Sequence, residues 1–225
     1  METRSIALDG PSGAGKSTLA KKAAERFKMI YVDTGALYRC VALHVIRNNV
    51  QTSDAPEVSK LLHDVVIDLK YDADGVQRTF LNNDDVSNEI RLPEISMGAS
   101  SVSAMPFVRD YLLSMQRELA VKYDVIMDGR DIGTVVIPNA GLKVYLTAAP
   151  ETRAYRRYLE LIEKNIATTL DDVLRDMIAR DKSDTERELS PLKPAKDSII
   201  LDTTDLDLEE SFEALAAIII SRFGI

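Results

Sequence analysis

The segment Ser5-Ile-Ala-Leu-Asp-Gly-Pro-Ser-Gly-Ala-Gly-Lys-Ser17 decides the fold of this chain. Its first five residues are mostly apolar, as in a buried strand, and residues 16–27 are helix formers with apolar side chains at helical spacing. Between strand and helix, two glycines five positions apart precede lysine and serine, which is the pattern of a phosphate-binding loop. A strand, this loop and a helix in succession predict an α/β protein that binds a nucleotide.

The loop residues predict how ATP and Mg²⁺ bind. Glycines let backbone N–H groups approach an anion without a Cβ in the way, and the start of the helix adds its positive end. We expect Lys16 to reach the β- and γ-phosphates and the Ser17 hydroxyl to ligate Mg²⁺. The residues expected to contact ATP here are Gly10, Pro11, Ser12, Gly13, Ala14, Gly15, Lys16, Ser17 and Thr18.

The composition limits the classes of function. The 225 residues are 45% hydrophobic, which suffices for one substantial core in one domain, or in one domain with small appendages. A formal net charge of −8 argues against broad binding of nucleic acid, because that requires a dense basic face. An anionic ligand must therefore meet a local cluster of basic residues.

The sequence predicts a cytoplasmic protein without a membrane partner. Residues 1–8 show no signal-peptide pattern, and the apolar run at 214–220 is far shorter than the roughly 20 residues that span a bilayer. The single cysteine, Cys40, cannot form an internal disulfide, and we interpret it as a small buried hydrophobe rather than a nucleophile.

Further short apolar segments predict a parallel sheet. A strand at 29–32 precedes a helix at 36–47, and helical stretches separate the later strands. Such alternation is typical of strands buried between helices on both faces of a sheet. The later predicted strands are residues 125–128, 143–147 and 198–202.

Two segments depart from this alternation. Residues 65–71 and 76–81 are β-rich and flank Asp72-Ala-Asp-Gly75, which predicts a hairpin on a satellite subdomain at about 34–104. Charged residues dominate two helical stretches between 153 and 196, and no strand is evident there. This second segment predicts a mobile cover.

Two polar motifs follow predicted strands. Asp33-Thr-Gly-Ala-Leu-Tyr-Arg39 follows the second strand, and Val125-Ile-Met-Asp-Gly-Arg-Asp131 ends a core strand in acid, glycine, arginine and acid. Ligands of open α/β sheets collect at the carboxyl ends of strands. Taken alone, Asp33 and Thr34 could equally form a helix cap, with Arg39 a solvated charge. The density of charge in the second motif favours a binding site.

Together these motifs resemble those of the bacterial cytidylate kinase family, in the nucleoside monophosphate kinase group. The resemblance extends from about Ile6 to Leu208, most of the chain. The matching motifs are the phosphate loop, residues 33–39, Arg109 after Pro106, Asp128-Gly-Arg-Asp-Ile-Gly-Thr134, and Arg180 through Pro191-Leu-Lys-Pro194.

The resemblance implies both a fold and an activity. The fold is that of P-loop nucleoside monophosphate kinases, a five-stranded parallel sheet core with helices on both faces. It places a monophosphate-binding subdomain at 34–104 and a lid at 153–190, so that the core comprises residues 1–33, 105–152 and 191–225. The activity is Mg²⁺-dependent, in-line transfer of the γ-phosphoryl group of ATP to CMP or dCMP, giving CDP or dCDP and ADP. We expect a monomer whose partners are these nucleotides.

The resemblance also assigns the acceptor site. The cytosine is expected to contact Ser100, Arg109 and Asp131, whose carboxylate can accept from the exocyclic amine. Arginines are expected to hold the acceptor phosphate, and an arginine and an acid to reach the ribose end of the monophosphate. Single arginines could be exchanged between these two groups. The phosphate set is Arg39, Arg130 and Arg187, the ribose pair is Arg180 and Asp184, and Thr34, Tyr38 and Asp128 complete the expected CMP-binding set.

On the donor side, the resemblance places cationic side chains at the start of the lid over the phosphates of ATP. These are Arg153, Arg156 and Arg157. The Mg²⁺ ion is expected on Ser17 and phosphate oxygens, with either Asp128 or Asp33 at its water shell. The residues expected to act in catalysis are Lys16, Arg130, Arg153, Arg157 and Arg187.

This machinery needs no general base, because an acceptor phosphate oxygen is already anionic near neutral pH. We therefore interpret His44 and His63, on apolar helical stretches, as ordinary residues at the edge of the core. Two other enzyme or binding classes remain as alternatives: a phosphate-loop kinase with another acceptor, and a nucleotide-operated switch. The sequence has no Asn-Lys-X-Asp motif for guanine, which argues against the switch.

Overall fold

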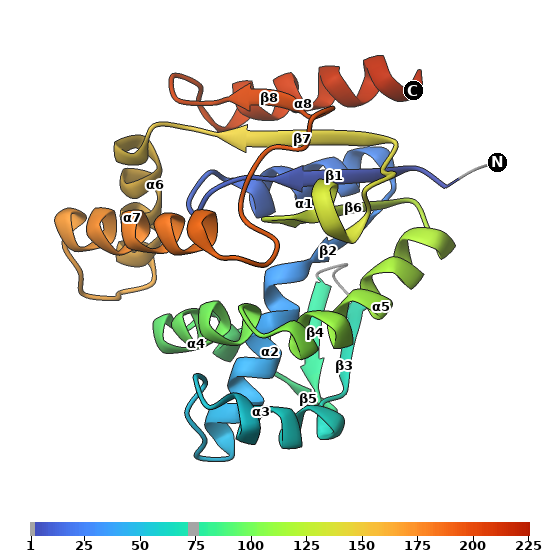
Figure 1. Ribbon diagram of the computed structural model, residues 1–225. Helices are drawn as coiled ribbons and strands as arrows, with labels where there is room; N and C mark the ends of the chain where they lie inside the picture. The colour runs from blue at the N-terminus through green and yellow to red at the C-terminus, as the bar shows by residue number, and fades with distance from the viewer. Residues whose placement is uncertain (1–2, 72–76) are drawn as a thin grey trace. The chain divides into compact units, whose positions relative to one another are not determined.

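The structure is a computed structural model that describes residues 3–71 and 77–225. The chain divides into two compact units (Figure 1), of which the first comprises Met1–Asp33 with Arg117–Ile225 and the second Thr34–Gln116. The first unit is thus made of two separate stretches of sequence, and the second of one continuous stretch. The predicted limits of the subdomain, the core and the lid stay predictions.

The first unit contains the parallel sheet that the sequence predicts, with five strands in the order β2-β6-β1-β7-β8. Every neighbouring pair is parallel, and the register sets Asp9 beside Gly129 and Asp33 beside Asp128. The strands are β1 (Ser5–Asp9), β2 (Ile30–Asp33), β6 (Val125–Gly129), β7 (Leu142–Thr147) and β8 (Ile199–Asp202).

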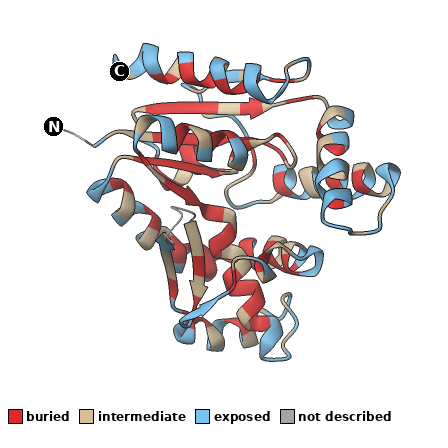
Figure 2. Cartoon of the chain, turned by 180° about the vertical axis from the view of Figure 1, so that it is seen from behind, coloured by how far each residue is buried: buried red, intermediate tan, exposed pale blue. Residues whose placement is uncertain are grey.

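Apolar residues of these strands form the core of the first unit with two helices. Helix α1 (Lys16–Phe27) contributes Leu19, and α8 (Leu208–Phe223) contributes Leu215, to one cluster with β1, β6 and β7. Figure 2 shows the sheet mostly buried. The edge strand β8 differs, since Ile199 and Ile200 are 45% and 55% exposed.

Two more helices occupy the segment that the sequence predicts to be a cover. They are α6 (Pro150–Glu163) and α7 (Leu170–Glu186), and they share a small apolar cluster of their own. The side chain of Thr169 caps α7 by accepting a hydrogen bond from the backbone of Asp172. A five-residue π-helix (Ile132–Val136), which the sequence did not predict, follows β6. In the part of the chain that the structure describes, no helix has both the length and the apolar character needed to cross a membrane.

The second unit combines helices with a small antiparallel sheet. The predicted hairpin is confirmed, because β3 (Ile67–Tyr71) and β4 (Gln77–Leu81) pair antiparallel, while its Asp72–Gly75 turn lies outside the described residues. A two-residue strand, β5 (Asp84–Asp85), extends the sheet. The remaining elements are α2 (Thr34–Arg47), α3 (Ala55–Leu61), 3₁₀ turns at Leu62–Asp64 and Glu89–Arg91, α4 (Pro93–Ser103) and the greater part of α5 (Pro106–Lys122). The residues of α5 from Arg117 on belong to the first unit.

Candidate active site

The phosphate loop joins β1 to α1, and two of its glycines are required by close packing. Gly10 has φ +154°, and a Cβ on it would lie 2.0 Å from the carbonyl oxygen of Leu146. Gly13 has φ +70°, and a Cβ there would lie 2.7 Å from Cε of Met177. Neither conformation suits an L side chain. The loop is therefore fixed between the end of β7 and helix α7.

Lys16 begins α1 and is almost wholly buried. Its Nζ donates to the carbonyl oxygen of Pro11 over 2.6 Å, so the ammonium group lies against the loop itself. Burial lowers the pKa of Lys16, and the positive charge of Arg130 lowers it further. A phosphate anion near this group would relieve both effects, because it favours the charged form of the lysine.

Asp128, in β6, is the centre of an acidic cluster beside the loop. Its Oδ2 accepts from the Ser17 hydroxyl over 2.8 Å and its Oδ1 from the Tyr31 hydroxyl over 2.9 Å. Burial and the charge of Asp33 raise the pKa of Asp128, against the opposing charge of Lys16.

The donor atoms of this cluster fit Mg²⁺. A hydroxyl and carboxylates are hard oxygen ligands, and Mg²⁺ is commonly held by one or two carboxylates together with phosphates. In residues 3–71 and 77–225, no cluster of three or more His, Cys, Asp or Glu side chains forms a complete metal site.

A second charged cluster lies where the loop after β6 contacts the end of α7. Arg130 donates from Nε to Oδ2 of Asp184 over 2.8 Å, and Arg187 approaches Asp184 at 3.8 Å and Asp131 at 3.7 Å. Burial opposes ionisation of Asp184, but the charges of Arg130, Arg180 and Arg187 outweigh it and lower its pKa. Five residues predicted to bind CMP are thus neighbours.

Asp9 belongs to the same region, and the sequence did not single it out. It is the last residue of β1, 2% exposed, and its two carboxylate oxygens accept from the backbone N–H groups of Ile132 (2.7 Å) and Gly133 (2.8 Å). Burial raises its pKa to about 6. An acid in an apolar strand just before the phosphate loop was the signal that could have found it.

The second unit carries the other residues predicted for the acceptor. Arg109 is buried in α5, donates from Nη1 to the carbonyl oxygen of Ser103 over 3.2 Å, and lies over the ring of Tyr38 at 5.7 Å. Ser103 in turn donates to the carbonyl oxygen of Ser100 over 2.9 Å. This unit therefore brings Tyr38, Ser100 and Arg109 together. The other two predicted residues, Thr34 and Arg39, lie in the first turns of α2.

Comparison with known proteins agrees with these motifs. A protein-family model described as cytidylate kinase matches residues 6–221. The chain belongs to the cytidylate kinase family.

Individual members of the cytidylate kinase family match over nearly their full length. A cytidylate kinase of Caldicellulosiruptor bescii is 47% identical over 210 residues, which covers 93% of this chain and 92% of that protein. One of Lactobacillus johnsonii is 46% identical, with 95% and 93% covered. Among solved structures, an uncharacterized protein from Eubacterium ventriosum has a TM-score of 0.53 at 15% identity, with 98% of this chain and 100% of that one covered, and shows similarity of fold alone.

Arg153, one of the arginines expected over the phosphates of ATP, packs against the phosphate loop. The side chain is buried, with Nε donating to the carbonyl oxygen of Ala148 and Nη1 to that of Ser12 over 2.7 Å and to Asp181 over 2.5 Å. The other oxygen of Asp181 accepts from the Ser12 backbone N–H over 2.9 Å. Arg153 and Asp181 thus hold the backbone of the phosphate loop at Ser12, and a contact of Arg153 with the donor phosphates stays a prediction.

The other two arginines of α6 also bond to protein groups. Arg156 donates to the carbonyl oxygens of Thr203 (2.6 Å) and Leu206 (3.0 Å), in the segment after β8. Arg157 is half-buried and pairs with Glu160 one turn away, at 2.7 Å. Their partners are therefore carbonyl oxygens and a neighbouring acid, and the expected contacts of Arg156 and Arg157 with ATP stay predictions.

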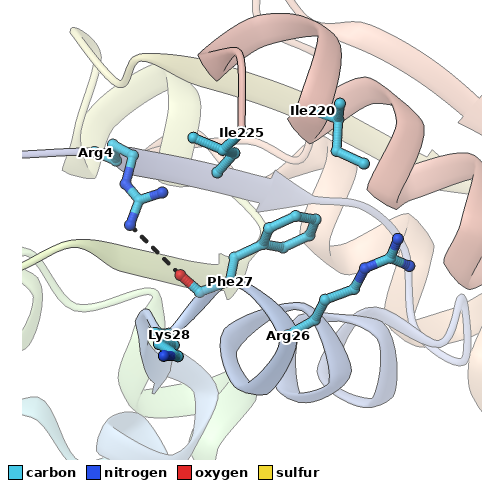
Figure 3. A pocket seen from close by; sticks show the side chains of 6 residues that line it. All are labelled: Arg4, Arg26, Phe27, Lys28, Ile220 and Ile225. Atoms are coloured by element: carbon cyan, nitrogen blue, oxygen red, sulfur yellow. Dashed lines mark hydrogen bonds between the residues drawn. The ribbon is translucent and has the colours of Figure 1, made fainter.

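A cavity of about 380 Å³ lies at the opposite end of β1 and α1 from the loop. Figure 3 shows Arg4 and Phe27 in its wall, joined by a hydrogen bond from Arg4 to the Phe27 carbonyl oxygen. Arg4 is paired with Asp124, and Arg26, also in the wall, with Glu213. These pairs neutralise much of the wall, and we assign it no part in the cytidylate kinase site.

Proposed function

We propose that this chain is a cytidylate kinase that transfers the γ-phosphoryl group of ATP to CMP or dCMP, giving CDP or dCDP and ADP. One observation carries the proposal beyond family membership. The phosphate loop and the Arg130–Asp184–Arg187 cluster both lie at the carboxyl edge of one parallel sheet, where α/β proteins bind ligands. The first unit therefore carries both the loop for a donor phosphate and a cationic cluster for an acceptor phosphate.

The donor side needs little covalent chemistry. Backbone N–H groups of the loop and Lys16 would hold the β- and γ-phosphates, and their preorganised positive charge would stabilise the transferring group. We propose Ser17 as the protein ligand of Mg²⁺, with Asp128 at its water shell because its carboxylate already accepts from the Ser17 hydroxyl. When bound, Mg²⁺ would neutralise charge on the phosphates.

On the acceptor side, arginines align the nucleophile. Arg39, Arg130 and Arg187 would hold the CMP phosphate, since a guanidinium can donate two hydrogen bonds to one phosphate and stays charged. Arg180 and Asp184 would reach the ribose. No side chain has to remove a proton, so alignment and charge neutralisation account for the catalysis.

For the base, we propose contacts from Ser100, Arg109 and Asp131. A carboxylate accepts from the exocyclic amine of cytosine, whereas uracil presents an acceptor at that position. The same residue would thus favour CMP and disfavour UMP. Of the lid arginines, Arg153 acts in this proposal by supporting the loop backbone, which is consistent with its bonds to Ser12 and Asp181.

A panel of acceptors tests the function. Release of ADP from ATP and Mg²⁺ is measured with CMP, dCMP, UMP, AMP, a small hydroxy acid or no acceptor, and products are identified by ³¹P NMR. We expect fast turnover with CMP and dCMP and little without an acceptor. ADP release that does not depend on any acceptor would indicate a nucleotide switch, and a preference for another acceptor would refute the substrate assignment.

The cellular setting and the assembly are also proposals. Both ATP and CMP are small metabolites, and we propose the cytoplasm as the compartment, in keeping with the single, buried Cys40. We propose that the chain acts as a monomer. Sedimentation at several protein concentrations tests this, because a mass that rises with concentration would contradict it.

A further inference from the structure

The carboxylate of Asp9 clamps the turn that carries two acceptor residues. Its oxygens accept from the N–H groups of Ile132 and Gly133, the first two residues after Arg130 and Asp131. Both N–H groups begin the π-helix Ile132–Val136, where a helix leaves donors without internal partners. Asp9 therefore fixes the backbone from which the Asp131 side chain departs.

The far end of the same turn is also held. Arg117 donates from Nε to the carbonyl oxygen of Val136 over 3.0 Å and from Nη2 to that of Val135 over 2.9 Å. Backbone N–H groups of Val135 and Val136 bond back to the Asp131 carbonyl oxygen, at 2.8 and 3.2 Å. The turn is thus gripped by a carboxylate at its start and by a guanidinium at its end.

We propose that Asp9 is a positioning residue for the acceptor, which sets the direction of Asp131 and Arg130 and so couples β1, and the phosphate loop that follows it, to recognition of the monophosphate. This inference rests on the proposed function. The pairing of Asp9 with Gly129 in neighbouring strands supports it, since the carboxylate reaches across the β1–β6 ladder to the next turn of chain.

The surroundings of Asp9 make a carboxylate unusual there. Burial and the charge of Asp131 disfavour its ionised form, while the two N–H groups and the charge of Lys16 favour it. On the β7 side, its charge acts on Tyr145, and the aliphatic part of Lys143 packs around the same Gly133. A buried acid that costs stability and binds the backbone beside a charged cluster is typical of a functional site.

The substitution Asp9→Asn isolates this contact. Asparagine has nearly the same shape, but one of its two terminal groups is an NH₂ donor, which would face an N–H donor and leave it unpaired. A matched control is Asp124→Asn, because Asp124 also accepts with both oxygens, from the backbone N–H and the Nε of Arg4, before β6 rather than after it.

Steady-state kinetics with CMP, UMP and ATP provide the test. We expect Asp9→Asn to lower kcat/KM for CMP by about 10- to 100-fold, to reduce the CMP over UMP preference, and to change the KM of ATP by less than about 3-fold. Asp124→Asn should leave all three unchanged. Equal losses toward ATP and CMP, with an unchanged CMP to UMP ratio, would overturn the proposal, because a purely structural role predicts them.

Two further measurements keep the outcome decisive. If Asp9→Asn does not fold, Arg117→Met must produce the same selective loss of kcat/KM for CMP. An unchanged kcat/KM for CMP in Arg117→Met would then overturn the proposal. In NMR spectra, the amide protons of Ile132 and Gly133 should titrate with a midpoint near the Asp9 pKa of about 6 in the wild type and not in Asp9→Asn. A wild-type chain inactive on CMP would instead refute the proposed function, while a wild type active on CMP with an equally active Asp9→Asn would refute only the role of Asp9.

Discussion

The hydroxyl of Ser17 donates a hydrogen bond to Oδ2 of Asp128 over 2.8 Å. This bond joins the first turn of α1 to β6, and Tyr31 in β2 holds the other oxygen of the same carboxylate. The hydroxyl that we propose as a Mg²⁺ ligand is therefore oriented by an acid whose own position is fixed from two strands.

We predict that Asp128→Asn will raise the Mg²⁺ concentration needed for half-maximal rate by about 10-fold or more, because loss of such a supporting contact weakens metal sites by 10- to 100-fold. Rates are measured against free Mg²⁺ at fixed ATP, and isothermal calorimetry of the Mg²⁺–ATP complex gives a reading without turnover. Tyr31→Phe should cause a smaller change of the same kind. An unchanged Mg²⁺ dependence in Asp128→Asn would exclude Asp128 from the metal site.

Lys16→Ala should lower turnover by about 10²-fold or more, as expected when one preorganised donor to the transferring group is removed. CMP binding, measured by calorimetry without ATP, should stay nearly the same, because we assign Lys16 to the donor. Lys22→Ala is the matched control, since Lys22 lies on the same helix and pairs at the surface with Glu209. Near-normal turnover in Lys16→Ala would contradict the assignment.

The phosphate loop could be predicted in full because its chemistry is local. Spacing of glycines, lysine and serine fixes both the strand-loop-helix order and the anion site, and the five strands follow from short apolar runs. The helices α4 and α5 were not predicted, although Pro93 and Pro106 stand at their first positions, as is common for helices. The apolar residues of these two helices are buried by contacts with elements that are distant in sequence. The pattern of a single segment does not reveal such contacts.

The arginines of α6 show where prediction from sequence ends. Arg153, Arg156 and Arg157 lie within one helical turn and a half, and pattern alone treats them alike. In the structure Arg153 is buried against Ser12, Arg156 binds carbonyls after β8, and Arg157 pairs with Glu160. Long-range packing decides among them, as it does for Asp9 and the π-helix.

This difference between the arginines can be measured. Arg153→Met should lower the free energy of unfolding by about 3–5 kcal/mol, because it leaves the largely buried Asp181 without its ionic partner. Arg157→Met should change it by less than about 0.5 kcal/mol, because the pair with Glu160 is near the surface. Urea denaturation compares the two, and similar losses would contradict the structural assignment.

Asp131→Ala should lower the preference for CMP over UMP by about one to two orders of magnitude, mostly through loss of CMP activity, since a hydrogen bond to a charged partner contributes roughly 1.5–3 kcal/mol. UMP activity should be retained or slightly raised. The ratio of kcat/KM for the two monophosphates is the measurement. A uniform loss at constant ratio would assign Asp131 to phosphate positioning or to the fold, and would leave base selection to Ser100 and Arg109.

Asp9 should give the chain a characteristic pH dependence of stability. Its pKa is raised from 3.8 to about 6, chiefly by burial, so the folded chain holds this proton more tightly than the unfolded chain. The resulting stabilisation is fully present below pH 3.8 and is lost as the pH rises through about 6. Asp9→Asn lacks this titration.

The stability of Asp9→Asn relative to wild type should therefore rise by up to about 3 kcal/mol between pH 4 and pH 7.5. Urea denaturation of both proteins across this pH range gives the difference in their free energies of unfolding. Any destabilisation by the amide group itself does not depend on pH, so it does not affect how this difference changes with pH. Asp124→Asn should show no such rise, since the pKa of Asp124 is lowered by its bonds to Arg4 in spite of partial burial. If the difference in stability between wild type and Asp9→Asn does not change with pH, the fold does not destabilise the ionised Asp9 carboxylate.

Strand β6 lies between β1 and β2 in the sheet, and this order constrains how the chain can fold during synthesis. Ser5 pairs with Val125, and Ile30 pairs with Val125 from the other side. On the ribosome both early strands emerge long before this shared partner, and synthesis of the whole of Thr34–Gln116 intervenes. Strands β1 and β2 therefore remain without their shared partner β6 until residue 125 and those after it have been synthesised. The second unit is continuous in sequence, so all of its internal contacts become available before β6 is made. Translation speed across residues 34–125, and chaperones that shield the waiting strands, should govern the yield of native protein in the cell.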